Sequence, residues 1–177
     1  MSECSEEFLA ELIGFVGESH GPYYGWDPVN QPMIRHFAEA MGDSNPVYQK
    51  PEYAKQSIHG GVVAPPTMLQ AWTMRGFTDV YREGSDTKAG FDAFDFLYKN
   101  GFTGVVAVNC EQDYKRYLQL GDDIYYHVAI DAISDEKKTG LGLGFFINQQ
   151  YSFFDQNDEL VATMLFRTLR FKPAKSQ

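Results

Sequence analysis

The second half of the chain constrains the fold most, because four strand-like segments follow one another there with short turns between them. These segments are rich in β-branched and aromatic residues, as strands are, and they cover residues 105–110, 124–130, 141–154 and 160–171. A polar turn at residues 155–159 joins the last two segments. Strands that follow one another through tight turns pair antiparallel, so this half predicts an antiparallel meander.

The first half of the chain has helical patterns instead. Residues 5–17 begin with a capping serine and carry apolar residues at helical intervals. Asn30 and Pro32 can open a helix that runs to Met41, and a further apolar helix is predicted from Met68 to about Phe77. Residues 78–101 are predicted to be a loop. Helices followed by an antiparallel meander indicate an α+β fold, and a length of 177 residues indicates a single domain over residues 1–177.

Composition excludes several classes of function. The net charge of −9 opposes nucleic-acid binding, which relies on clustered Lys and Arg. No segment is long and apolar enough to cross a membrane, and the acidic N-terminus lacks the layout of a secretory signal. A cytoplasmic protein is therefore expected. The two cysteines, Cys4 and Cys110, have no metal-like spacing, and Cys110 is predicted to be buried in a strand. Neither a metal nor a cofactor is expected.

Four short motifs carry the functional information. The first is Gly42-Asp43-Ser44-Asn45-Pro46-Val47-Tyr48, directly after the second predicted helix. From the residues alone it is a helix-ending turn in which Asp and Asn bond their own backbone. The other three motifs occupy residues 63–68, which read Val-Ala-Pro-Pro-Thr-Met, and residues 113–122 and 158–167.

Together these motifs resemble the MaoC-like, R-specific enoyl-CoA hydratases. The resemblance implies a hot-dog fold, in which a curved sheet wraps a helix, here residues 32–41 or 66–77. In that family the loop continues Gly-Asp-x-Asn-Pro-aliphatic-His, and its Asp and His act on water and on the substrate α-proton. This chain has Tyr48 at the position of that histidine.

Within the family the chain resembles the larger, non-catalytic subunits of actinobacterial hydratases that act on steroid side-chain thioesters. The resemblance implies an acyl-CoA substrate and a second, smaller MaoC-like subunit that carries the catalytic Asp and His. It also implies a thiolase-like or aldolase-like partner, bound through a further domain that would follow Gln177.

The chemistry of hydration supports a non-catalytic chain. Adding water to an enoyl thioester requires a base for water, an acid for the α-carbon and donors for the thioester oxygen. A phenol titrates near pH 10, so Tyr48 does not replace an imidazole at neutral pH. Pro65 and Pro66 stand where active domains often have His-Gly, and proline has no N–H to donate. We therefore expect no catalytic residue in this chain, and Asp43 and His59 are only secondary candidates.

The candidates for substrate binding are Asn45, Tyr48, His59, Gly60 and Gly61, and no metal ligand is expected. The other three histidines are predicted to be structural. Apolar and aromatic residues in the middle of the chain are predicted to line a wide acyl pocket or, alternatively, a subunit interface. They are Phe77, Tyr81, Phe91, Phe94, Phe96, Leu97 and Tyr98. Cations that could meet CoA phosphates are Lys115, Arg116, Lys137, Lys138 and Arg170, and the sequence does not choose among them.

Two other functions stay open from the sequence. The chain could be a competent homodimeric hydratase or dehydratase that uses Asp43 with His59. It could also be a docking scaffold that binds a protein partner and no acyl-CoA.

Overall fold

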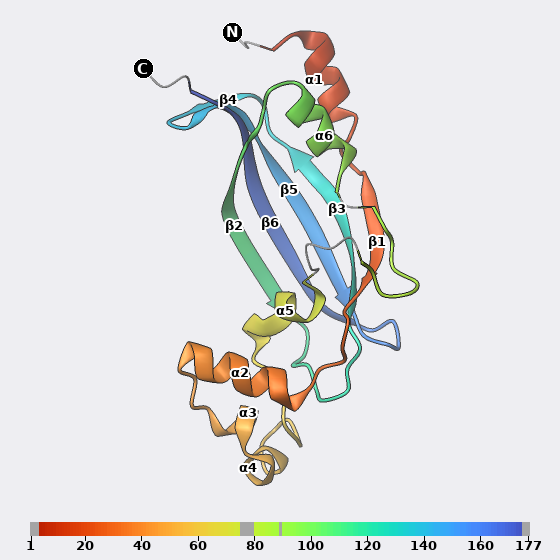
Figure 1. Ribbon diagram of the computed structural model, residues 1–177, viewed down its shortest axis with the longest axis vertical. Coiled ribbons are helices and arrows are strands. Elements are labelled where there is room, and N and C mark those ends of the chain that lie inside the picture. The colour runs from red at the N-terminus through yellow and green to blue at the C-terminus, as the bar shows by residue number, and fades with distance from the viewer. Residues whose placement is uncertain (1–3, 75–79, 89, 175–177) are drawn as a thin grey trace.

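The computed structural model describes residues 4–74, 80–88 and 90–174 (Figure 1). The helices all lie in the first 99 residues. They are α1 (Glu6–Ile13), α2 (Gln31–Met41), α3 (Pro46–Gln49), α4 (Pro51–Lys55), the 3-10 helix η1 (Pro66–Met68), α5 (Leu69–Thr73) and α6 (Asp92–Lys99). The strands are β1 (Ser19–Tyr24), β2 (Gly104–Tyr114), β3 (Tyr125–Ile133), β4 (Lys137–Thr139), β5 (Gly142–Phe154) and β6 (Leu160–Pro173).

The strands form one antiparallel sheet in the order β1-β3-β5-β6-β2, and β4 adds a short pairing to β5. The long strands β5 and β6 form its centre. The sheet is curved, with α1 and α6 near one end and α2, α3 and α4 beyond the other (Figure 1). The predicted α+β fold with an antiparallel sheet is confirmed.

Side chains alternate across the strands, so one face of the sheet is apolar and packs against the helices. On β5 the residues Phe145, Ile147 and Phe153 are almost fully buried on this face. The buried side chains form two clusters, one around α2–α5 and one around α1 and α6. The core is therefore divided into two parts, one near each end of the sheet.

The cap residues of α2 match the sequence prediction. The Asn30 side chain accepts a hydrogen bond from the Met33 N–H at 3.0 Å, and Pro32 lies in the first turn. Gly42 ends the helix with φ of 66°, a conformation that glycine adopts without steric cost. This local chemistry places the Asp43 loop at a fixed point.

Some sequence predictions of local structure were wrong. The helix predicted over residues 5–17 ends at Ile13, because Gly14 caps it and the Gly17 N–H donates to Ile130 O. No strand was predicted in the first half of the chain, yet β1 pairs with β3. The predicted loop over residues 78–101 contains α6, which buries Ala93 and Leu97.

Cys110 was predicted to be buried, but it is exposed because β2 is an edge strand. Most of β2 is exposed, including the side chains of Val105, Val106 and Val108. Among the strands that the structure describes, β2 pairs only with β6, so its outer edge presents backbone N–H and C=O groups.

Of the two helices proposed to lie against the sheet, α5 does so and α2 lies beyond the sheet end (Figure 1). The predicted helix 66–77 begins as η1 at Pro66, and α5 ends at Thr73; its last predicted residues fall in 75–77, outside the described residues. No helix among the described residues is long and apolar enough to cross a bilayer.

Candidate functional site

The Asp43 loop is a tight turn held by its own polar side chains. Asp43 Oδ1 accepts a hydrogen bond from the Asn45 N–H at 2.9 Å, and Asn45 Oδ1 accepts from the Val47 N–H at 3.2 Å. Asn45 thereby caps α3, and the Gln49 side chain donates to Asp43 O at 3.1 Å. The turn chemistry expected from the residues alone is present, and it fixes the direction of the Asp43 carboxylate.

Tyr48 occupies the position of the family histidine and is almost fully buried, with 7% of its surface exposed. Burial raises the pKa of its phenol, and the nearby Tyr117 and Asp43 raise this pKa further, while a hydrogen bond with the Asn45 side chain opposes the shift. The phenol therefore stays protonated at neutral pH and is no base for water. It packs in the core beside the loop instead.

Tyr117 lies close to both Tyr48 and His59. The rings of His59 and Tyr117 have centroids 4.4 Å apart, and Tyr117 is also close enough to Tyr48 to raise the pKa of the Tyr48 phenol. The described residues show no hydrogen bond between His59 and Asp43. Tyr117 was not among the site residues predicted from the sequence, although it lies within the motif at residues 113–122.

The segment that leads to α5 offers few backbone donors. Pro65 and Pro66 have no N–H, and the Met68 N–H donates to Pro65 O at 2.9 Å. The preceding Ala64 N–H is used by Leu118 O at 2.8 Å. Gly60 has φ of 69° and forms a bend in front of this segment. The described backbone N–H groups of this segment therefore do not form an oxyanion hole.

Arg116 is a structural residue and not a free cation for CoA. Its guanidinium contacts the Asp122 carboxylate at 2.6 Å and the Asp155 carboxylate at 2.8 Å. Asp155 also accepts hydrogen bonds from the N–H groups of Asn157 and Glu159. Burial opposes ionisation of Asp155, but these three donors outweigh it and hold the pKa of its carboxyl below the usual range.

We expect Asp155→Asn to lower the free energy of unfolding by about 2 kcal/mol at pH 7, because it removes a buried charge partner of Arg116. A carboxyl with a lowered pKa stabilises the folded state above its ordinary pKa and loses that contribution as the pH falls through the lowered value. The difference between wild type and variant should therefore shrink below about pH 4. Denaturant unfolding at pH 7 and at pH 3 measures this, and a constant difference would contradict it.

The apolar face of the sheet carries two cavities that share Tyr126 and Tyr151. The first, of about 160 Å³, lies between the sheet and α5; its walls include Gln70, Thr73, Phe153 and Met164. The second, of about 230 Å³, lies between the sheet and α6; its walls include Tyr23, Phe91, Phe94, Val128 and Arg170. Because both cavities contact the same two tyrosines, they lie next to each other along the sheet, and we call the two together the concave site.

Only some of the described residues that were predicted to line a pocket do so. Phe91 and Phe94 line the concave site. Phe96 stacks on Phe8 at 5.0 Å, Leu97 is fully buried, and Tyr98 is 65% exposed. Tyr81 is half-buried, whereas Phe77 lies outside the described residues. The prediction of a pocket therefore applies to two residues of the set.

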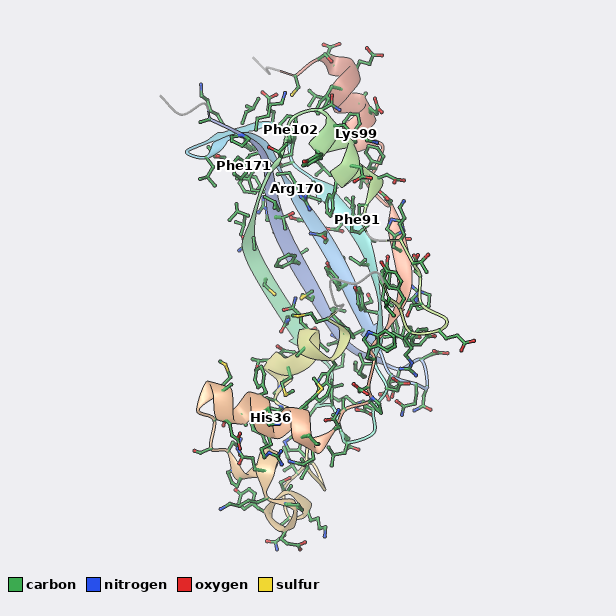
Figure 2. The ribbon with its side chains drawn as sticks, viewed as in Figure 1. His36, Phe91, Lys99, Phe102, Arg170 and Phe171 are labelled. Carbon is green, nitrogen blue, oxygen red and sulfur yellow. The ribbon has the colours of Figure 1, made fainter. Side chains whose placement is uncertain are left out.

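The other histidines lie in different surroundings. His36 is exposed on α2 (Figure 2) and His127 is exposed on β3, whereas His20 lines the concave site and contacts Glu18 at 2.8 Å. Within the described parts of the chain, no group of three or more His, Cys, Asp or Glu side chains could hold a metal ion.

Comparison with known proteins identifies the family. Residues 15–164 match the family described as "FAS1-like, dehydratase domain region". The chain belongs to this family. As a FAS1-like dehydratase domain it also matches the MaoC-like dehydratase from Rhodospirillum rubrum, with a TM-score of 0.63 and 19% identity over 90% of this chain and 94% of that chain. This second match concerns the fold alone, and it confirms the expected hot-dog fold.

More similar relatives of this FAS1-like dehydratase domain are known. It is 43% identical to a "Probable enoyl-CoA hydratase alpha subunit" of Thermomonospora curvata, over 97% of this chain and 54% of the relative. It is also 43% identical to the "3-oxo-4,17-pregnadiene-20-carboxyl-CoA hydratase alpha subunit" of Mycobacterium tuberculosis, over 88% of this chain and 49% of the relative. The chain thus spans about half of the length of these relatives.

Among solved structures, a chain of the ChsH1-ChsH2 complex from Mycobacterium tuberculosis superimposes with a TM-score of 0.81. The sequences are 40% identical, and the match covers 97% of this chain and 93% of that chain. The fold is therefore shared with a chain that was crystallised as part of the ChsH1-ChsH2 complex.

Proposed function

We propose that the chain is the non-catalytic subunit of a heteromeric enoyl-CoA hydratase that acts on a bulky, steroid-like acyl group. In this reaction a base takes a proton from water, the oxygen bonds to the β-carbon, and the α-carbon receives a proton while the thioester oxygen is stabilised. The base and acid would come from a second MaoC-like subunit, and this chain would hold the acyl group.

The observation that carries the proposal is the chemistry of Tyr48. A buried phenol with a raised pKa stands where the family has its histidine, and Asp43 has no imidazole hydrogen-bonded to it among the described residues. Pro65 and Pro66 also remove two backbone donors from the start of the following helix. A lone carboxylate is a weak base near neutral pH. The loop therefore keeps the turn of the family motif but lacks its catalytic histidine.

The outer edge of β2 offers a place for the second subunit. A long, exposed edge strand with apolar side chains pairs readily with a strand of another chain. The exposed fractions of Val105, Val106 and Val108 are 55%, 38% and 47%. Pairing at this edge would extend the sheet across two subunits and cover these valines. The assembly of the ChsH1-ChsH2 complex supports a partner of this kind.

The concave site offers a place for the acyl group. Its walls combine aromatic and apolar side chains, which suit a flat hydrocarbon ring system, with polar side chains such as Gln70 and Gln149. The name of the Mycobacterium tuberculosis relative supports a steroid side-chain thioester as the substrate class. The predicted thiolase-like or aldolase-like partner stays a prediction, and so does a cytoplasmic location.

Co-expression with a small MaoC-like protein that bears an Asp/His pair tests the proposal. The purified chain alone should hydrate neither a steroid enoyl-CoA nor crotonyl-CoA, whereas the complex should hydrate the steroid thioester. Robust turnover by the chain alone would overturn the proposal. His59→Ala would then test the alternative in which Asp43 and His59 act together in a homodimer.

A further inference from the structure

Arg170 lies on β6 at the α6 end of the concave site, with Phe91 nearby (Figure 2). Its guanidinium carbon is 3.9 Å from the centre of the Phe94 ring. Arg170 faces Phe145 in the sheet, and Phe145 is six residues along β5 from Tyr151. At about 3.4 Å per residue, the backbone positions of Phe145 and Tyr151 lie roughly 20 Å apart along the strand, and the side chains of Arg170 and Tyr151 both reach the second cavity.

The guanidinium of Arg170 has no polar partner among the described residues. It forms no ion pair and no hydrogen bond there, and its Nε is buried without an acceptor. Burial lowers its pKa. Arg82 and Arg116, by contrast, each hold a carboxylate with two nitrogen atoms. Arg170 is half-buried, and a ligand that supplies an acceptor to its guanidinium would satisfy these donors.

Stacking on Phe94 does not use these donors. A ring face attracts the charge of a guanidinium, but the N–H groups point outward in the plane of the guanidinium. Among the described residues, the wall of the second cavity contains no acidic side chain, and the amide oxygen of Gln149, which also lines it, accepts from the Tyr151 hydroxyl at 3.4 Å. A ligand oxygen is therefore the acceptor that we expect for Arg170.

We propose that Arg170 binds a ring carbonyl oxygen at the end of the acyl group that is farthest from the thioester. The inference rests on the proposed function and narrows its substrate class to acyl groups with a distal ketone. Tyr126 and Tyr151 would flank the middle of the ring system, and the cavity beside α5 would take the part nearer the thioester. A distal ketone is also named in the substrate of the Mycobacterium tuberculosis relative, as its 3-oxo group.

The test is binding without turnover. The probes are the 17-carboxylic acid of 4-androsten-3-one, which carries no CoA, and the analogue that lacks the 3-ketone. The wild-type chain should bind the ketone at least about tenfold more tightly, as a hydrogen bond from a charged donor allows. Arg170→Met should lower the affinity for the ketone to that of the analogue and leave the affinity for the analogue unchanged.

Arg167→Met is the matched control, because Arg167 lies on the opposite face of β6 and its guanidinium also stacks on a phenylalanine, at 4.7 Å. This control should keep the tenfold preference. Arg170→Met should also keep or raise the thermal midpoint, since it removes a half-buried cation that has no anionic partner among the described residues.

The inference is overturned if Arg170→Met keeps the preference, if the wild type has none or binds neither probe, or if the variant loses affinity for both probes together with stability. Hydration of crotonyl-CoA by the complex reports separately on the proposed function. Active complex with no ketone preference would reject the role of Arg170 alone.

Discussion

Replacing Val106 and Val108 with glutamate will separate this chain from its catalytic partner while leaving its own fold intact. Both side chains are exposed, so two carboxylates there cost the isolated chain little. At a strand edge that pairs with another chain the same charges become buried and unpaired. We expect the dissociation constant of the complex to rise at least about tenfold, with a matching loss of hydratase activity at low protein concentration.

Ile13→Glu provides the control for this experiment, because Ile13 is 49% exposed on α1, away from β2. Calorimetry should show unchanged binding for the control and unchanged thermal midpoints for both variants. If the β2 variant binds the partner as tightly as wild type, the subunits meet elsewhere.

Filling the concave site will remove activity toward bulky substrates only. Val128 is 6% exposed and lines the larger cavity, so Val128→Phe places a ring in the space proposed for the acyl group. We expect kcat/KM of the complex for a steroid enoyl-CoA to fall by on the order of 100-fold, because a misplaced thioester no longer meets the catalytic pair. Turnover of crotonyl-CoA, which does not reach this cavity, should stay within about threefold.

The short substrate is the internal control for folding and assembly, since overpacking of a core costs typically about 1–3 kcal/mol. Val128→Ile adds less volume and should give an intermediate loss. Equal losses for both substrates would contradict a role of this cavity in acyl binding.

Structural features that depend on residues close together in the sequence could be predicted. Asn30, Pro32 and Gly42 fix the ends of α2 through their own backbone preferences and hydrogen bonds. The turn between β5 and β6, and the strand pattern of apolar and polar residues on either side of it, could be predicted in the same way. Features that depend on distant partners were missed. β1 forms because β3, about a hundred residues away, pairs with it, although Gly21-Pro22 reads as a turn.

The same division holds for the candidate site. The motif from Gly42 to Tyr48 was recognisable, and its turn follows from the side chains of Asp43 and Asn45. Tyr117 reaches this site from a segment about seventy residues later in the chain, so its proximity to Tyr48 could not be predicted from a local sequence pattern. The concave site arises only when residues of β1, β3, β5, β6, α5 and α6 meet. The role that we propose for Arg170 could therefore not be predicted from the sequence, where it was one of five candidate cations.

The central claim is that this chain holds the substrate while another chain performs the proton chemistry. The most direct measurement is the rate of steroid enoyl-CoA hydration by the complex after Asp43→Ala in this chain, compared with alanine substitution of the Asp/His pair in the partner. Asp43→Ala should leave the rate within about threefold, whereas the partner substitutions should lower it by at least about 100-fold. A loss of that size from Asp43→Ala in a correctly assembled complex would contradict the division of labour.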